Sequence, residues 1–145
     1  IRMRKFVRSL GNATNGIKHL LRERNFRIQL VIGAVILSLG ALIQVDKNDY
    51  YWLLFCTFMV LLLEGINTLI EKLADILRPY YDERVRVLKD TAASVVLLGS
   101  AVSVLIGLSI ILQTIFGLHF AVGLLFGIII LVVFFSLGLF GGGRE

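Results

Sequence analysis

The sequence predicts an all-α integral membrane protein with an N-terminal amphipathic surface helix, three transmembrane helices and a fourth, C-terminal transmembrane helix. The 145-residue chain is 57% hydrophobic, and its mean hydropathy is +0.87. Both values are too high for an ordinary soluble domain. The apolar residues also gather in separate segments, each long enough to cross a bilayer. These observations together define the fold class.

The first predicted element is an amphipathic helix over residues 4–22. Apolar side chains recur there at helical spacing, at Phe6, Leu10, Ala13, Ile17 and Leu21. Cations flank them, at Arg4, Lys5, Arg8, Lys18 and Arg22. This pattern is typical of a helix that lies in the membrane interface with its apolar face toward the acyl chains.

Three spans follow, at about residues 25–45, 50–77 and 88–112. The stretch DKND (46–49) predicts the first turn, and RPYYDERVR (78–86) predicts a polar loop in which Pro79 ends the second helix. The second span measures about 42 Å at 1.5 Å per residue. A hydrocarbon core is about 30 Å thick, so the last turns of this helix should emerge from the bilayer.

Small residues punctuate the last two apolar segments. Gly99, Ser103 and Gly107 are four residues apart in the third span, and Gly123 and Gly127 repeat that spacing in the apolar stretch 118–140. Small residues four apart allow transmembrane helices to approach closely. We therefore expect these positions to be helix contacts.

Cations are distributed unevenly between the predicted loops. Residues 1–27 hold eight Lys and Arg, the turn 46–49 holds one, and the loop 72–89 holds five. The positive-inside rule then places the N-terminus and the 72–89 loop in the cytoplasm. The net charge of +5 lies next to apolar spans, which indicates contact with anionic lipid headgroups and not with nucleic acid.

A polar stripe stands out in the second span, which otherwise begins with an uncharged apolar run. Glu64, Asn67, Glu71 and Asp75 lie at offsets of three, seven and eleven residues. At about 100° per residue they fall within roughly 80° of one helix face. A carboxylate inside a bilayer is costly unless it is paired, hydrated or functional, so the stripe predicts a site.

Polar residues at the mouths of the other spans extend this site. Glu23 stands at the start of the first span, and Lys89 and Asp90 at the start of the third. Carboxylates of this kind suit Mg²⁺, which prefers one or two of them together with phosphate oxygens, and such a cation offsets charge in phosphoryl transfer. Glu64 lies deeper and is the candidate general base for a lipid hydroxyl.

Three segments carry a family resemblance: ERNFRIQL (23–30), EGINTLIEKLAD (64–75) and KDTAASVVLL (89–98). They resemble, in order and spacing, the small bacterial integral-membrane lipid kinases, which include diacylglycerol kinase and undecaprenol kinase. The resemblance covers about residues 4–112. It implies a membrane lipid kinase domain over 1–112, followed by an extra C-terminal apolar segment over 113–145.

The resemblance also implies roles for individual residues. Glu64 matches the family's catalytic base, and Glu23 and Glu71 match the carboxylates that hold the divalent ions bridging ATP. The nucleotide-binding set it implies is Glu23, Asn67, Glu71, Asp75, Lys89 and Asp90. We accordingly expect a homotrimer in the bacterial inner membrane, with Mg²⁺ as cofactor, ATP as co-substrate and active sites between subunits.

Some positions depart from the family pattern. Tyr80 and Asp82 replace more typical loop residues, Ser94 stands where many members have Gly, and Asn12 and Thr14 replace aromatic residues of the N-terminal helix. For the acceptor lipid, the segment RNFRIQL (24–30) is more similar to the undecaprenol kinase branch than to the diacylglycerol branch.

Two other functions remain open at this point. An intramembrane carboxylate beside small-residue packing also fits a small proton or cation pathway. A member of the kinase fold without catalytic activity would act as a membrane interaction protein. Flux without ATP would favour the first, and lipid-coupled ATP hydrolysis would exclude the second.

Overall fold

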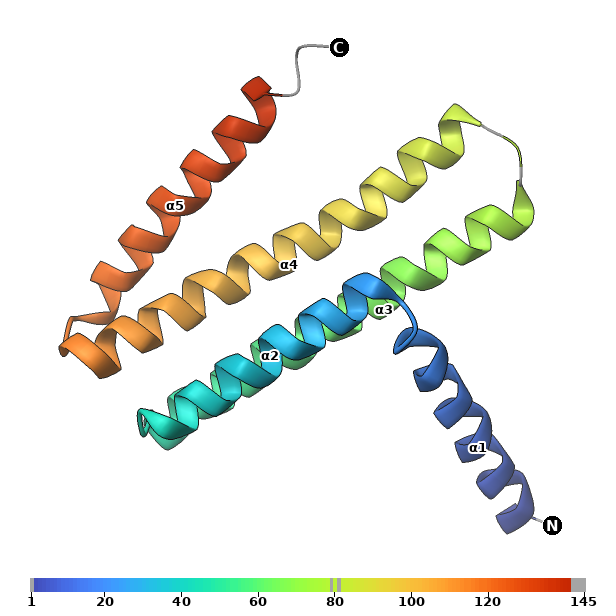
Figure 1. Ribbon diagram of the computed structural model, residues 1–145, viewed down its shortest axis with the longest axis horizontal. Helices are drawn as coiled ribbons and strands as arrows, with labels where there is room; N and C mark the ends of the chain where they lie inside the picture. Colours follow the sequence, from blue (N-terminus) through green and yellow to red (C-terminus); the bar gives the residue numbers. More distant parts are fainter. Residues whose placement is uncertain (1, 79, 81, 142–145) are drawn as a thin grey trace.

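The computed structural model describes residues 2–78, 80 and 82–141, which form five α-helices and, within these ranges, no strand. The helices are α1 (Arg2–Leu20), α2 (Arg24–Leu42), α3 (Lys47–Leu77), α4 (Glu83–Phe116) and α5 (Phe120–Gly141). α3 packs against both α2 and α4, and α4 packs against α5. Figure 1 shows α1 leaving this bundle at an angle. The all-α class predicted from the sequence is confirmed.

The amphipathic helix α1 keeps its apolar side chains on the surface. Phe6, Leu10 and Ile17 are all more than half exposed. At its end, Leu20 meets the bundle, since a Cβ built at Gly65 of α3 would lie 3.6 Å from a methyl group of Leu20. The exposed face is consistent with a helix that requires another apolar phase, such as a membrane interface.

The connection between α2 and α3 uses two capping motifs. Gln44 adopts the left-handed conformation with φ of 56°, and the Val45 amide donates to the Gly40 carbonyl at 3.0 Å, which closes a Schellman motif. Asp46 then caps α3 by accepting from the Asn48 amide at 3.0 Å. α2 consequently ends three residues before the predicted limit at 45, and α3 begins three residues before the predicted start at 50.

The loop between α3 and α4 is shorter than the sequence predicts. α3 ends at Leu77 as expected, but α4 begins at Glu83, inside the segment 78–86 that we predict as loop. The reason is local, because the Asp82 carboxylate accepts from the Arg84 amide at 2.9 Å and so caps the helix. Pro79 and Tyr81 lie outside the described residues.

The helix α5 packs closely on α4, and the chain reverses direction between the two helices at Gly117. That residue has φ of 63°, a conformation that suits glycine. A Cβ built at Gly123 would lie 2.5 Å from the Ser109 Cα, and one at Gly127 would lie 2.6 Å from a Leu105 methyl. The small residues of the fourth apolar segment are therefore contacts with α4, as predicted.

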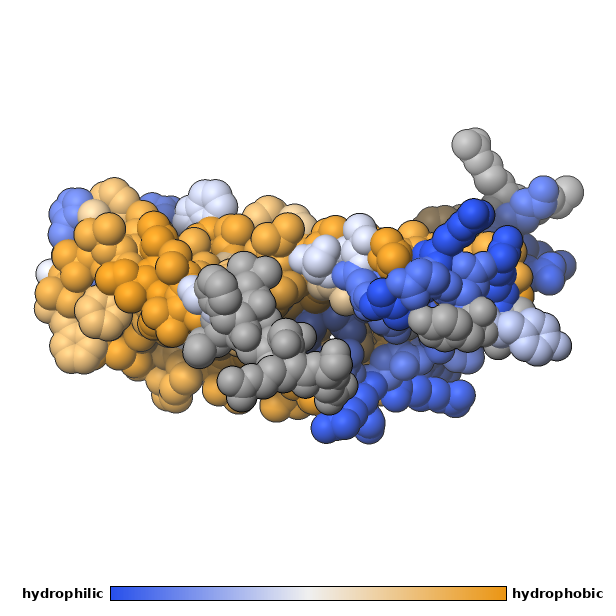
Figure 2. Space-filling model, turned by 90° about the horizontal axis from the view of Figure 1, so that it is seen from above, coloured by the Kyte–Doolittle hydropathy of each residue, from blue (hydrophilic) through white to orange (hydrophobic). Residues whose placement is uncertain are grey.

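The surface of the molecule divides into apolar and polar parts. Three helices, α2, α3 and α4, are long and apolar enough to cross a membrane, and α5 spans about 33 Å for its 22 residues. Figure 2 shows hydrophilic residues gathered at one end of the long axis and hydrophobic residues over most of the remainder. We call the first end, formed by residues 20–27, 71–78 and 82–90, the charged end.

Candidate active site

The polar stripe of α3 runs from the buried part of the helix to the charged end. Glu64 and Asn67 are 4% and 5% exposed, Glu71 is intermediate, and the Asp75 side chain is 65% exposed. The four residues extend over about 16 Å of helix axis. One face of α3 thus carries carboxylates from a dry environment to a wet one.

The buried carboxylate of Glu64 is held from α2. The Gln29 amide Nε2 donates to Glu64 Oε2 at 3.1 Å. This bond leaves Glu64 Oε1 as an acceptor for another donor. Gln29 Oε1 is itself buried and has no hydrogen-bond partner. A buried amide oxygen without a partner is uncommon in folded proteins, so this pair presents two acceptor atoms at one place.

Asn67 links the buried and exposed parts of the stripe. Its Nδ2 donates to Glu71 Oε1 at 2.9 Å, one turn along α3. Its Oδ1 is buried and has no hydrogen-bond partner, and the same is true of Gln29 Oε1. Both amides therefore orient a neighbouring carboxylate while they leave a carbonyl oxygen unsatisfied.

Glu23 joins the site from the α1–α2 junction. Its Oε1 lies 2.6 Å from Lys72 Nζ on α3, one residue after Glu71. The loop backbone supports this position, because the Arg27 amide donates to the Glu23 carbonyl. The sequence predicts that Glu23 and the stripe meet, and the ion pair brings Glu23 to the level of Glu71.

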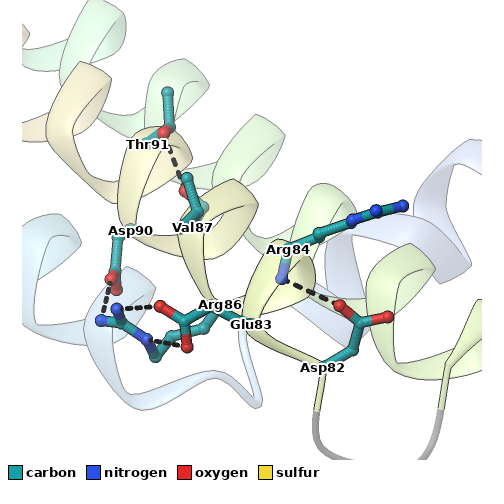
Figure 3. Close-up of polar contacts among 7 residues, drawn as sticks. All are labelled: Asp82, Glu83, Arg84, Arg86, Val87, Asp90 and Thr91. Atoms are coloured by element: carbon teal, nitrogen blue, oxygen red, sulfur yellow. Dashed lines mark hydrogen bonds and ion pairs between the residues drawn. The ribbon is translucent and has the colours of Figure 1, made fainter.

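The start of α4 contributes two residues in different directions. Lys89 forms an ion pair with Asp75 across the α3–α4 interface. Asp90 instead pairs within its own helix, with Arg86 at 3.1 Å, and Arg86 also donates from Nε to Glu83 at 3.0 Å. Figure 3 shows Arg86 between these two carboxylates. Among the candidates of α4, Lys89 therefore pairs with the α3 stripe, whereas Asp90 pairs within its own helix.

A divalent cation fits this donor set only in part. Among the described residues, no three His, Cys, Asp or Glu side chains are close enough to form a metal cage. Mg²⁺ does not need one, because it keeps several waters and takes phosphate oxygens beside one or two carboxylates. Glu23, which pairs with Lys72, and Glu71, the residue before Lys72, supply carboxylates of the kind used in that mode of binding.

Comparison with known proteins agrees with this arrangement. The family model for prokaryotic diacylglycerol kinase matches residues 11–111. The chain belongs to this family. The matched range contains every candidate residue described above and excludes α5.

A curated relative gives the same result over a shorter range. It is a diacylglycerol kinase from Synechocystis sp. (strain ATCC 27184 / PCC 6803 / Kazusa), 30% identical over 86 residues, which are 59% of this chain and 49% of the relative. The match therefore spans about half the length of that relative. No solved structure matches the chain.

The sequence analysis did not predict three residues that contact the candidate site residues: Gln29, Lys72 and Arg86. Gln29 carried a usable signal, since it is the single strongly polar side chain in the stretch 28–37, where an amide needs a buried partner. Lys72 and Arg86 lie in charged segments, where spacing alone does not say which carboxylate each one pairs with.

Proposed function

We propose that this chain transfers the γ-phosphoryl group of ATP to the hydroxyl of a membrane lipid. The observation that carries the proposal is the Glu64 carboxylate, buried in α3 and held by Gln29, at the inner end of a stripe that leads to exposed carboxylates. Membership of the prokaryotic diacylglycerol kinase family supports this activity.

In the proposed reaction, Glu64 accepts the proton of the lipid hydroxyl at Oε1 while Gln29 holds Oε2. The hydroxyl oxygen then attacks the γ-phosphorus, a new P–O bond forms, and the bond to the β-phosphate oxygen breaks to release ADP. A positioned base contributes about 10²–10⁴-fold in such reactions. The depth of Glu64, about 10 Å along α3 from Glu71, suits a substrate whose chains stay in the bilayer.

Glu23 and Glu71 are the residues that would hold Mg²⁺ with the ATP phosphates, and Asn67, Asp75, Lys89 and Asp90 would surround the nucleotide. The bound cation supplies charge neutralisation between phosphates. Lys72 pairs with Oε1 of Glu23 in the structure, so its ammonium would compete with a bound cation for the Glu23 carboxylate. An ammonium displaced from Glu23 would be available to a phosphate oxygen.

The positive-inside rule supports a cytoplasmic position for the charged end, in the bacterial inner membrane. ATP is present on that side. The homotrimer with sites between subunits remains a prediction from the family resemblance, and Asp90, which pairs within its own helix, is the residue that a neighbouring subunit would bring into a site.

Two acceptor lipids are in competition. The name of the curated relative supports diacylglycerol, and the segment 24–30 supports undecaprenol. The test is to incubate the full chain in mixed micelles with γ-³²P-labelled ATP, Mg²⁺ and each lipid separately. Label in the extracted lipid with either acceptor, lost on chelation of Mg²⁺, supports the proposal, and the faster acceptor identifies the substrate. Absence of label with both would overturn it.

A further inference from the structure

A cavity lies at the end of the bundle opposite the charged end, between α3, α4 and α5. Its volume is about 420 Å³, within the range of small-ligand sites. The lining residues are Asp49, Trp52, Ile106, Ser109, Ile110, Gln113, Phe120 and Leu124. Gln113 and the two α5 residues lie beyond the range that the family model matches, so the cavity depends on the additional C-terminal helix.

The walls of the cavity are mainly apolar. Ile106 and Ile110 come from successive turns of α4, and Leu124 faces them from α5. These side chains offer hydrocarbon contact of the kind that binds acyl chains. A membrane lipid is therefore a better match for the walls than a water-soluble metabolite.

Asp49 and Ser109 supply hydrogen-bond acceptors to the cavity, while the Trp52 indole and the Gln113 amide also carry N–H donors. Ser109 Oγ donates to the Leu105 carbonyl at 2.7 Å, which leaves its lone pairs to the cavity. The ionised Asp49 carboxylate can only accept hydrogen bonds. It takes part in none of the ion pairs formed within the described residues. A ligand with several N–H donors complements Asp49 and Ser109.

The carboxylate and the aromatic ring of the cavity indicate the charge of the ligand. Trp52 lies one turn after Asp49 on α3, so an indole and a carboxylate share one side of the cavity. An aromatic face beside a carboxylate attracts a cation. The segment 46–49 holds two carboxylates and one ammonium, which disfavours a lipid with net negative charge.

We propose that this cavity binds the headgroup of a phospholipid with a primary ammonium group, with the ammonium between Asp49 and Trp52 and the first part of an acyl chain against Ile106, Ile110 and Leu124. Lys47 lies at the same helix end but does not line the cavity, and its ammonium lies 5.8 Å from the centroid of the Tyr51 ring, so the ammonium of the lipid is the charge that the cavity itself recognises. The site is separate from the proposed kinase site and does not depend on it.

Trp52 provides the readout, because it is the only tryptophan in the chain. The full chain is reconstituted in vesicles of unbrominated lipid that contain a small, increasing fraction of brominated phospholipid. Three probes have identical acyl chains and carry ethanolamine, choline or glycerol headgroups. Quenching by random contact is equal for the three, so a site for the ammonium headgroup appears as additional, saturable quenching by the ethanolamine lipid alone.

Asp49→Asn should remove at least half of this additional quenching, whereas Asp46→Asn should retain it, because Asn also caps a helix and Asp46 does not line the cavity. A second variant, Leu124→Phe, fills the cavity without a change of charge and should reduce the quenching similarly, with helicity unchanged by circular dichroism. Equal quenching by the three probes, stronger quenching by the glycerol lipid, or full retention in Asp49→Asn with native helicity would each overturn the proposal.

Discussion

The two ends of the bundle treat their polar side chains differently. At the charged end, besides local pairs such as Asp90 with Arg86, two ion pairs join elements that are distant in sequence, Glu23 with Lys72 and Asp75 with Lys89. At the opposite end, the described residues form no ion pair: Asp46 and His119 accept from the nearby Asn48 and Ala121 amides, and the uncharged Tyr50 hydroxyl donates to the Leu37 carbonyl across α2 and α3. Cross-helix pairs gather several charges at one place, whereas local caps only end helices.

This difference indicates where chemistry on a phosphate is possible. Charge neutralisation of ATP requires several ionic groups within a few ångströms of one another. The charged end offers carboxylates and cations from α2, α3 and α4 together. The opposite end offers an apolar cavity with one carboxylate, which suits binding and not phosphoryl transfer.

The largest expected effect comes from Glu64→Gln. Removal of the proposed base should lower kcat for lipid phosphorylation by at least about 100-fold, and the Michaelis constant for ATP should change little. Asp46→Asn at the opposite end is the matched control and should retain activity. If both variants were equally active, the contrast between the two ends would have no catalytic meaning.

The next effect concerns the metal ion. Glu23→Gln and Glu71→Gln should each raise the Mg²⁺ concentration for half-maximal activity by roughly tenfold or more, because Mg²⁺ binds through only one or two protein carboxylates. A magnesium titration of the kinase rate measures this. Unchanged magnesium titration curves for both variants would contradict the assignment of Glu23 and Glu71 as metal ligands.

A smaller loss is expected for Gln29→Leu. The amide orients Glu64 through one hydrogen bond, and such a bond to a carboxylate contributes about 1.5–3 kcal/mol, so kcat should fall by roughly tenfold or somewhat more. As a positioning residue, Gln29 should also alter the pH profile of kcat without a change in the magnesium titration. A profile identical to that of the wild type would assign Gln29 a structural role only.

Lys72→Met should act in the opposite direction to Glu23→Gln. Removal of the competing ammonium should lower the half-maximal Mg²⁺ concentration by no more than about fivefold, since an ion pair this exposed is worth at most about 1 kcal/mol. The same titration checks it. A large increase instead would show that Lys72 binds phosphate more strongly than it restrains Glu23.

The smallest effect on activity is expected for a substitution at the end opposite the charged end. Gly123→Ala places a methyl group 2.5 Å from the Ser109 Cα, so α5 must shift, at a cost of about 1–3 kcal/mol. Thermal unfolding in detergent should show the loss, while kinase activity stays near that of the wild type. Gly11→Ala has open space around its new methyl group and is the stability control. Equal melting temperatures for both variants would contradict close packing of α5.

The sequence was sufficient for the fold class and for the elements that depend on periodicity. It predicts the apolar helices and the face shared by Glu64, Asn67 and Glu71, because a helix repeats every 3.6 residues. It misplaces the start of α4, where Asp82 caps a helix inside an apparently polar loop. Local capping outweighs composition at such boundaries.

Pairing across helices was less accessible. Glu23 and the stripe were expected to meet, and the Lys72 contact brings them to one level. Gln29 was not expected to hold Glu64, and Asp90 was expected at the site but contacts Arg86. The Glu64–Gln29 pair depends on how α2 and α3 rotate against one another, which is set by packing of residues like Gly33 and not by spacing along the chain. The Asp90–Arg86 pair is different, because residues four apart on one helix are neighbours.

The most direct test is single-turnover transfer of labelled γ-phosphate from pre-bound ATP to lipid, measured for the wild type and for Glu64→Gln at saturating Mg²⁺. We expect labelled phosphate to appear rapidly in the acceptor lipid with the native chain. With Glu64→Gln the label should be nearly absent, although the variant still binds Mg²⁺-ATP. Equal transfer rates for the two proteins would contradict the role of the buried carboxylate.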